Sequence, residues 1–170
     1  MTQSSPDISP VFDQDPLDLR LTVASIIHWA DSREVREQTM AKVGFPFDDI
    51  PMFLVVNQLC YRGALRPTDL ASTLGTGKAN MSKIVRRLED AGLVARVASQ
   101  IDERSILVAL TADGRAIGER IVQASDEHYR SVTDGWSDED VDTLRRLLGR
   151  FARHAVVELA HRSPALMPPR

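Results

Sequence analysis

The stretch that decides the fold is KANMSKIVRRLEDAGLVARVASQIDERSILVAL, residues 78–110. Its first half repeats apolar residues at helical spacing and ends at Gly92, a residue favoured where a helix stops in a left-handed conformation. Its second half holds two β-rich runs, LVARVAS and SILVAL, joined by a polar tip that includes Asp102, Glu103 and Arg104. We therefore predict a helix followed by a two-stranded hairpin.

Two further helices are predicted just before this stretch. The run PTDLASTL, residues 67–74, is separated from the longer helix by a turn that contains Gly75 and Gly77. The run IPMFLVVNQLCYRG, residues 50–63, has proline in its first turn and is apolar almost all round, which indicates a buried helix. Helix, short turn, helix and hairpin, in that order, make a winged helix-turn-helix.

Long helices are predicted on both sides of this motif. Asp15 and Pro16 favour a helix start, and helical spacing continues to about Met40. Thr111 is placed to cap a helix that runs from residue 112 to about 132, and Ser137 to cap the last one. The apolar residues of that last helix recur at spacings of three and four, which is typical of a helix packed along another helix.

The expected fold class is therefore mainly α with a small β-hairpin wing (α+β). Residues 1–15 are expected to form a disordered arm and residues 164–170 a tail. Between them we expect one domain, residues 16–163. Its winged helix-turn-helix covers about 48–111, flanked by outer helices at about 16–42 and 112–162.

Composition limits the class of protein. Hydrophobic residues make up 43% of the 170 residues and charged residues 26%, as in ordinary soluble domains. No apolar run is long enough to span a membrane, and the N-terminus has no secretory signal, so we expect a cytoplasmic protein with no membrane partner. The single cysteine, Cys60, makes a disulfide framework or a metal cluster implausible, and we expect no cofactor.

Charge is distributed unevenly along the chain. Residues 62–120 contain ten basic and seven acidic residues in a chain whose net charge is −3, so the remainder carries −6. A relatively basic centre between acidic flanks is expected where one segment meets an anionic partner.

The helix that begins at Lys78 divides into two faces. A recognition helix buries one side on its own domain and offers the other to the major groove of double-stranded DNA. Asn80 and Ser82, near its start, are suited to hydrogen bonds with bases. The basic residues are suited to phosphates, which set position and salt dependence. The expected inward residues are Met81, Ile84, Val85, Leu88 and Leu93, and the expected phosphate contacts are Lys78, Lys83, Arg86 and Arg87.

The hairpin tip is the second candidate DNA contact. A cationic side chain on a projecting ribbon can enter the minor groove, where the phosphate field is concentrated. We expect Arg104 to make this contact and Asp102 to hold its guanidinium extended. A tip of this kind is also compatible with a solvated loop, and winged helices also serve as protein-interaction modules.

The stretch LRPTDLASTLGTGKANMSKIVRRLEDAGLVARVASQIDERSILVALTADG, residues 65–114, resembles the MarR family of winged-helix transcription factors. The resemblance rests on a DLA…LG first helix and a K…S…RRLE.AGLV reading helix. It also rests on the D-x-R wing at Asp102 and Arg104, and on the L-T-x-x-G step that begins at Leu110. These motifs cover roughly a third of the chain.

The resemblance implies a homodimer whose N- and C-terminal helices interlock and whose two lobes read a pseudo-palindrome, usually as a repressor. It also implies a small aromatic or amphipathic effector in a cleft between the dimer helices and each winged lobe. Gly77 departs from the family pattern, because relatives usually place serine or threonine before the reading helix, so capping should be weaker or shifted. The expected effector residues are His28, Trp29, Met52 and Tyr61.

Two rival interpretations start from single motifs. The segment GTGK, residues 75–78, lacks the length and the preceding strand of a phosphate loop, and the four histidines have no metal-ligand spacing. We therefore expect a protein that is not an enzyme. Cys60 is the candidate for a thiol-based redox sensor, but its apolar neighbours should raise its pKa, which favours a structural role.

Overall fold

The computed structural model describes residues 18–99 and 105–160, with side chains up to residue 155. The chain divides into two compact parts, one ending at Gln38 and one beginning at Thr39.

The first part contains helix α1, Leu19–Ala30, and most of α2, Arg33–Val43. Asp18 caps α1 by accepting the backbone N–H of Arg20 at 2.7 Å, whereas the predicted start at Asp15 and Pro16 lies outside the described residues. The prediction of one long helix to about Met40 is wrong, because the chain turns between the two helices. Ser32 accepts the N–H of Val35 at 3.2 Å and so caps a new helix, since a serine hydroxyl competes well with backbone hydrogen bonding.

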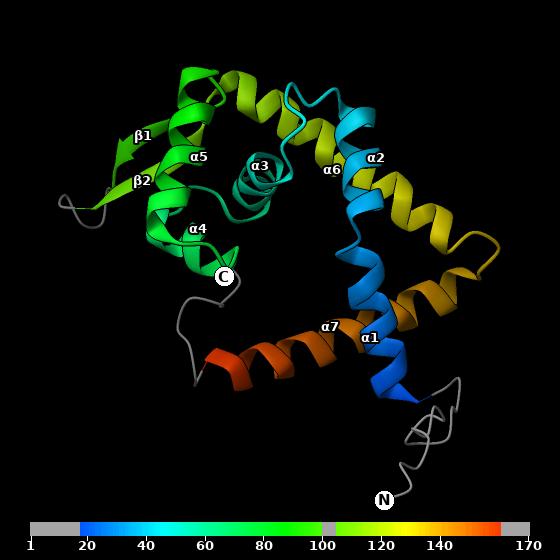
Figure 1. Cartoon of the computed structure of the whole chain (residues 1–170). Helices are drawn as coiled ribbons and strands as arrows, with labels where there is room; N and C mark the ends of the chain where they lie inside the picture. The colour runs from blue at the N-terminus through cyan, green and yellow to red at the C-terminus, as the bar shows by residue number, and fades with distance from the viewer. Residues whose placement is uncertain (1–17, 100–104, 161–170) are drawn as a thin grey trace, which may run out of the picture. The chain divides into compact units, whose positions relative to one another are not determined.

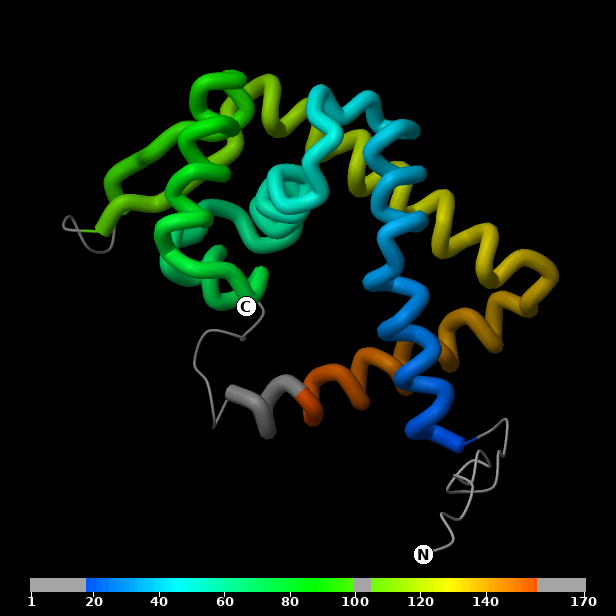
Figure 2. Tube along the Cα trace, viewed as in Figure 1, coloured from blue at the N-terminus to red at the C-terminus, as the bar shows by residue number. Residues whose placement is uncertain are grey.

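After the last residues of α2, the second part continues with three helices, α3, α4 and α5 (Figures 1 and 2). Helix α3 spans Ile50–Arg62, and Asp49 caps it by accepting the N–H of Met52 at 3.0 Å. The φ of +73° at Gly63 ends this helix. Helix α4 spans Pro67–Thr73 and α5 spans Lys78–Asp90, so the predicted helices are confirmed.

The hairpin is also confirmed. Strands β1, Val94–Ala98, and β2, Ile106–Leu110, pair antiparallel. A further pairing was not predicted: Leu65 and Val108 exchange two backbone hydrogen bonds of 3.1 and 2.7 Å. This bridge ties the segment between α3 and α4 to the second strand of the wing.

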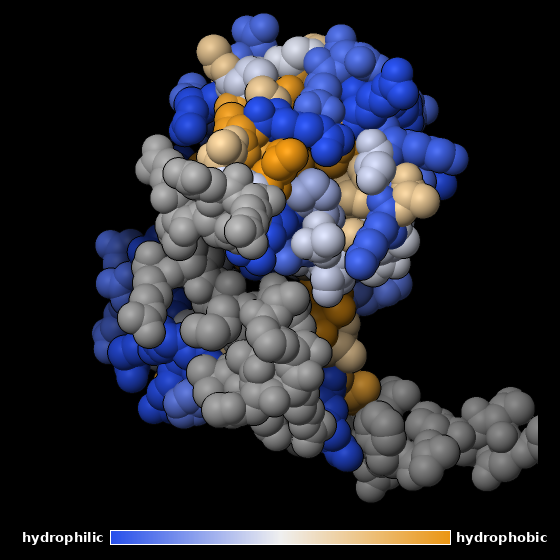
Figure 3. Space-filling view, turned by 90° about the vertical axis from the view of Figure 1, so that its left-hand side faces the viewer, coloured by the Kyte–Doolittle hydropathy of each residue, from blue (hydrophilic) through white to orange (hydrophobic). Residues whose placement is uncertain are grey.

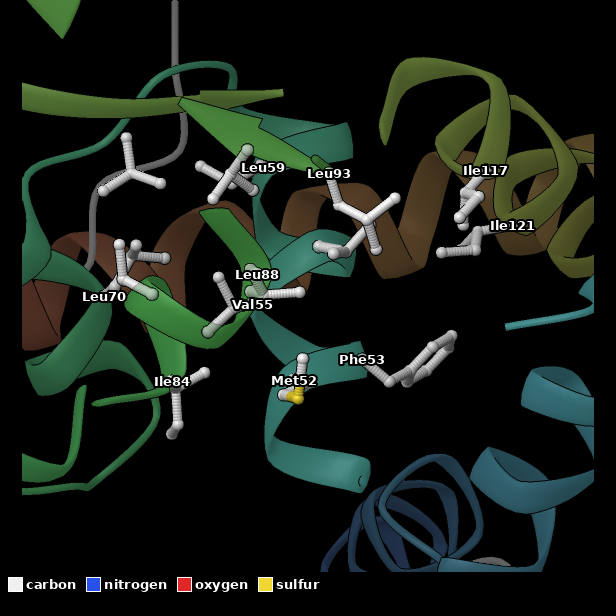
Figure 4. Packing of buried hydrophobic residues seen from close by; sticks show 14 of the residues in the cluster. Met52, Phe53, Val55, Leu59, Leu70, Ile84, Leu88, Leu93, Ile117 and Ile121 are labelled. Atoms are coloured by element: carbon white, nitrogen blue, oxygen red, sulfur yellow. The ribbon is translucent and has the colours of Figure 1, made fainter. Parts of the chain in front are cut away.

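The core lies among α3, α4, α5, the hairpin and α6, as the close view in Figure 4 shows. Met52 and Val55 of α3 pack in the same cluster as Ile84 and Leu88 of α5. Each fully buried side chain of this size contributes about 1.5–3 kcal/mol of hydrophobic free energy. The residues expected to face inward from the reading helix and its end are all buried: Met81, Ile84, Val85, Leu88 and Leu93.

Helices α6, Ala112–Val132, and α7, Asp138–Ala160, complete the described chain. The Thr111 hydroxyl accepts the N–H of Gly114 at 3.1 Å and donates to the carbonyl of Gly92 at 2.5 Å, which anchors α6 beside the hairpin. Ser137 accepts the N–H of Asp140 at 3.2 Å and caps α7 as predicted. No helix within residues 18–99 and 105–160 has the length and apolar character needed to cross a membrane.

Candidate nucleic-acid interface

Helix α5 presents a basic face on the side away from the core. Its buried residues lie on one side of the helix, and Lys78, Lys83 and Arg86 are exposed. Successive residues of an α-helix are about 100° apart, which places Lys83 and Arg86 almost opposite the buried side. Within the described residues these three cations have no ion pair with a carboxylate, so their charges are available to an anionic partner.

The start of α5 is capped without a side chain. Gly77 is the N-cap residue and supplies no hydroxyl, as the sequence indicated. Thr76 instead accepts a hydrogen bond of 2.9 Å from the Asn80 amide nitrogen. Ser82 donates at 3.0 Å to the backbone carbonyl of Lys78. Both predicted base readers are therefore exposed, and each is held by a local hydrogen bond that contact with a base would replace.

Two basic residues near this face are engaged in ion pairs. Arg87 contacts Asp49 at the start of α3, with 2.5 Å between Nη1 and Oδ2. Arg96 of β1 contacts Glu89 of α5, with 3.0 Å between Nε and Oε2. Neither pair was predicted from the sequence. Asp49 and Arg87 are 38 residues apart in the chain, and Glu89 and Arg96 belong to different elements, so no local pattern contains either pair.

The wing is described up to its last rung. The N–H of Ser99 donates to the carbonyl of Ser105 at 2.9 Å, which closes the ladder below the tip. Asp102 and Arg104 lie in residues 100–104, outside the described residues.

The side of the molecule shown in Figure 3 is largely hydrophilic in its upper lobe, with apolar surface in small patches.

The predicted effector residues are divided between the two parts of the chain. Met52 is completely buried in the core of the second part. Tyr61 is on the surface of the same part, and its hydroxyl donates to the Ser125 hydroxyl at 3.3 Å. His28 and Trp29 belong to α1 in the first part of the chain.

A pocket of about 580 Å³ opens between the end of α3, β2 and α6. No sequence pattern predicted this pocket, because its walls come from three separate segments. Charged and apolar side chains share its lining, which suits an amphipathic molecule. Its lining includes Leu59, Leu110, Val122, Arg115, Glu119 and Arg130.

Cys60 lines the same pocket and is half-buried. Burial raises the pKa of its thiol to about 11, and the positive charge of Arg115 opposes this shift only weakly. Because the thiolate is the reactive species, a thiol with this pKa reacts slowly with oxidants at neutral pH. This agrees with the structural role favoured from its apolar sequence neighbours.

Residues 50–106 match the model of the MarR family. The regulator PecS of Dickeya dadantii is 32% identical over 93 residues, which cover 55% of this chain and 56% of PecS. The regulator FarR of Neisseria gonorrhoeae is 30% identical over 99 residues, covering 58% of this chain and 68% of FarR. The organic hydroperoxide resistance transcriptional regulator of Bacillus subtilis is 29% identical over 133 residues, covering 78% of this chain and 86% of that protein.

Among solved structures, a MarR family protein from Bacillus stearothermophilus matches with a TM-score of 0.65 at 20% identity, over 80% of this chain and 93% of that one. This likeness shows the fold. Sequence matches to some relatives, including PecS, span little more than half of the relative's length. The relatives named here are transcriptional regulators rather than enzymes, in line with expectation. The family model and the match to two thirds of FarR show that the chain belongs to the MarR family.

Proposed function

We propose that this protein is a DNA-binding transcriptional regulator that inserts α5 into the major groove of double-stranded DNA. The observation that carries the proposal is the division of α5 into a buried apolar side and an exposed side whose three cations have no ion pair among the residues that the structure describes. A helix anchored in this way can approach DNA as a rigid body. Lys78, Lys83 and Arg86 then contact phosphates, while Asn80 and Ser82 reach base edges.

The wing supplies the second contact. Arg104 enters the minor groove and Asp102 orients its guanidinium. The described strands support this role because the bridge between Leu65 and Val108 fixes the base of the hairpin to the helix-turn-helix. A protein-interaction module would have no use for this arginine.

The regulator acts as a homodimer and, as a repressor, blocks a promoter at a palindromic operator. Residues 16–163 form its single functional domain. Two copies of α5 then lie about 34 Å apart, which places the half-site centres about 10 bp apart. Apolar side chains exposed on α6 and α7 of a single chain, such as Tyr129 and Phe151, support dimerisation through these helices.

A small amphipathic effector controls DNA binding. The pocket between α3, β2 and α6 supports this because its volume lies within the range of about 300–1,000 Å³ usual for ligand sites. The four residues expected from the resemblance are not among the lining residues of this pocket. Tyr61 is exposed elsewhere on the surface of the same part, whereas Met52 has no exposed surface. We also propose that His28 and Trp29 contact the effector.

Gel-shift titrations with DNA from beside the protein's own gene, followed by footprinting, test this function. We expect a protected palindrome, and affinity that falls steeply as salt rises because phosphate contacts release counterions. Arg86→Ala and Arg104→Ala should each weaken binding while circular dichroism shows an intact fold. Unchanged binding by Arg104→Ala would overturn the role of the wing, and equal affinity for all duplexes would overturn sequence-specific recognition.

A further inference from the structure

A single carboxylate joins the start of α3 to the last turn of α5. One oxygen of Asp49 accepts the N–H of Met52 at 3.0 Å and caps α3. Its other oxygen lies 2.5 Å from Nη1 of Arg87. The Asp49 side chain is 21% exposed and that of Arg87 55% exposed, so the pair lies at the edge of the packed lobe.

The position of Arg87 is poor for a phosphate contact. It lies about 100° round the helix from Arg86, on the flank that faces the start of α3, where its guanidinium contacts Asp49. Its charge is largely balanced by Asp49, so it adds little to the positive field of the exposed face.

The apolar packing between α3 and α5 does not by itself fix the rotation of α5 about its own axis. Met52 of α3 and Ile84 and Leu88 of α5 meet in an apolar cluster, which Figure 4 shows. Apolar contacts are not directional, so by themselves they set the distance between two helices better than the rotation of one helix about its axis. A charged hydrogen bond at the rim restricts that rotation.

We infer that Arg87 is a positioning residue, which acts through its ion pair with Asp49 to set the rotation of α5 and so the placement of Lys83 and Arg86 on DNA. This inference rests on the proposed function, since it assigns a role to a residue of the same reading helix. It replaces the expectation that Arg87 contacts phosphate directly.

Removal of the Asp49 charge should have the opposite effect on DNA binding from removal of other acidic charges near this face. Removing an acidic residue near a DNA-binding face ordinarily tightens binding, because it lowers repulsion of phosphate. If Asp49 positions α5, Asp49→Asn must instead weaken binding to a specific site. Asparagine caps helices as well as aspartate does, so this variant preserves the cap of α3 and removes the charge that holds Arg87.

The experiment uses a duplex that the wild-type protein enriches from random-sequence DNA, and a shuffled duplex as the non-specific competitor. Dissociation constants are measured over a range of salt concentrations for Arg87→Gln, Asp49→Asn and the double variant. Arg86→Gln is the matched control for a free arginine, and Asp90→Asn is the matched control for an exposed acid of α5 that has no ion pair among the described residues. Thermal melting by circular dichroism verifies the fold of each variant.

We expect Arg87→Gln and Asp49→Asn each to weaken specific binding about threefold to fivefold, in keeping with a partly exposed ion pair. The double variant should be no weaker than either single one, because both remove the same contact. The salt dependence of log K should keep its slope in Arg87→Gln but lose about one unit in Arg86→Gln. Asp90→Asn should bind more tightly than the wild type.

The inference is overturned if Arg87→Gln lowers the salt slope as much as Arg86→Gln does, or if Asp49→Asn tightens specific binding as Asp90→Asn does. Additive losses in the double variant would overturn it as well. Failure of the proposed function gives a different result: the wild type then enriches no duplex, or Arg86→Gln binds the enriched duplex as tightly as the wild type.

Discussion

Cys60 illustrates how one residue's environment decides its chemistry. Apolar sequence neighbours predicted an inert thiol, and burial of the side chain raises its pKa to about 11. Its sulfur faces α6 so closely that a methyl group at Gly118 would lie 2.7 Å from it. The thiol is therefore a packing group at neutral pH.

The raised pKa predicts how stability depends on pH. Below pH 9.0, the ordinary value, the thiol is protonated in both the folded and unfolded states. Between 9.0 and about 11 it ionises in the unfolded state first, so the free energy of unfolding falls as pH rises through this window. We expect Cys60 to account for about 1 kcal/mol of that fall at this partly exposed site.

Denaturant titrations of the wild type and Cys60→Ser between pH 7 and 11 measure this contribution, with the pH values chosen around the titration window. The serine variant should lose less stability over that range, because its hydroxyl does not ionise there. Equal losses in both proteins would show that the thiol titrates alike in the folded and unfolded states. Mass spectrometry after peroxide treatment at neutral pH should find Cys60 unmodified.

Helix α6 docks through two glycines as well as through the buried side chain of Ile117 at its first turns. A Cβ at Gly114 would lie 1.9 Å from the backbone carbonyl oxygen of Leu93, and one at Gly118 would meet the Cys60 sulfur. These positions let the helix axis approach the winged lobe closely. The sequence contained the glycines, but only the tertiary contact explains why they are needed.

Alanine substitutions test this close approach. Gly118→Ala should lower the free energy of unfolding by about 1–3 kcal/mol, the usual cost of overpacking a core. The matched control is Gly149→Ala in α7, where a Cβ would lie 3.5 Å from the Arg153 side chain. That change should be neutral or stabilising by up to about 1 kcal/mol, because alanine favours helix over glycine. Chemical denaturation compares the two, and equal stabilities would contradict the close contact.

The start of α5 has no side-chain cap, and a serine at position 77 should supply one. Gly77 has a φ of −72°, and a Cβ there would meet no atom within 4 Å. Gly77→Ser should therefore fit without strain and add a hydroxyl that accepts an N–H of the first turn. We expect a gain of a few tenths of a kcal/mol, about 0.5 at most. A lower melting temperature than that of the wild type would show that the serine cannot reach this geometry.

Local signals account for most element boundaries. Thr111 and Ser137 cap helices, and Gly63 and Gly92 end them, as residue types near each boundary indicated. The cap of α3 at Asp49 is equally local, although it was not predicted. These interactions span four residues or fewer, so a sequence pattern contains them. The break at Ser32 was missed because its apolar neighbours continue the helical spacing on both sides.

At the scale of the whole molecule, apolar surface remains uncovered in a single chain. Leu144, Leu148 and Phe151 of α7 are each about 40% exposed. Their spacing of four and three residues places them on one face, as in a helix that packs along another. We assign this face to the proposed dimer.

Placing a charge on this face should separate the two subunits. Leu148→Glu should convert the dimer to a monomer, as measured by light scattering after size exclusion, and should abolish binding to a palindromic operator. Arg146→Glu introduces the same side chain at an exposed position of α7 that is already charged, and it should leave the dimer intact. A dimeric Leu148→Glu protein would place the subunit interface elsewhere.

The sequence by itself determined the order of the elements from α3 onward and the two faces of α5, because helix periodicity, caps and turn residues act over a few positions. It also determined the family, through the motifs of the reading helix and the wing. The tertiary structure decided three other matters: the pocket, the bridge between Leu65 and Val108, and the pairing of Arg87 with Asp49. Each joins segments far apart in the chain, and such contacts depend on how the helices pack rather than on any local pattern.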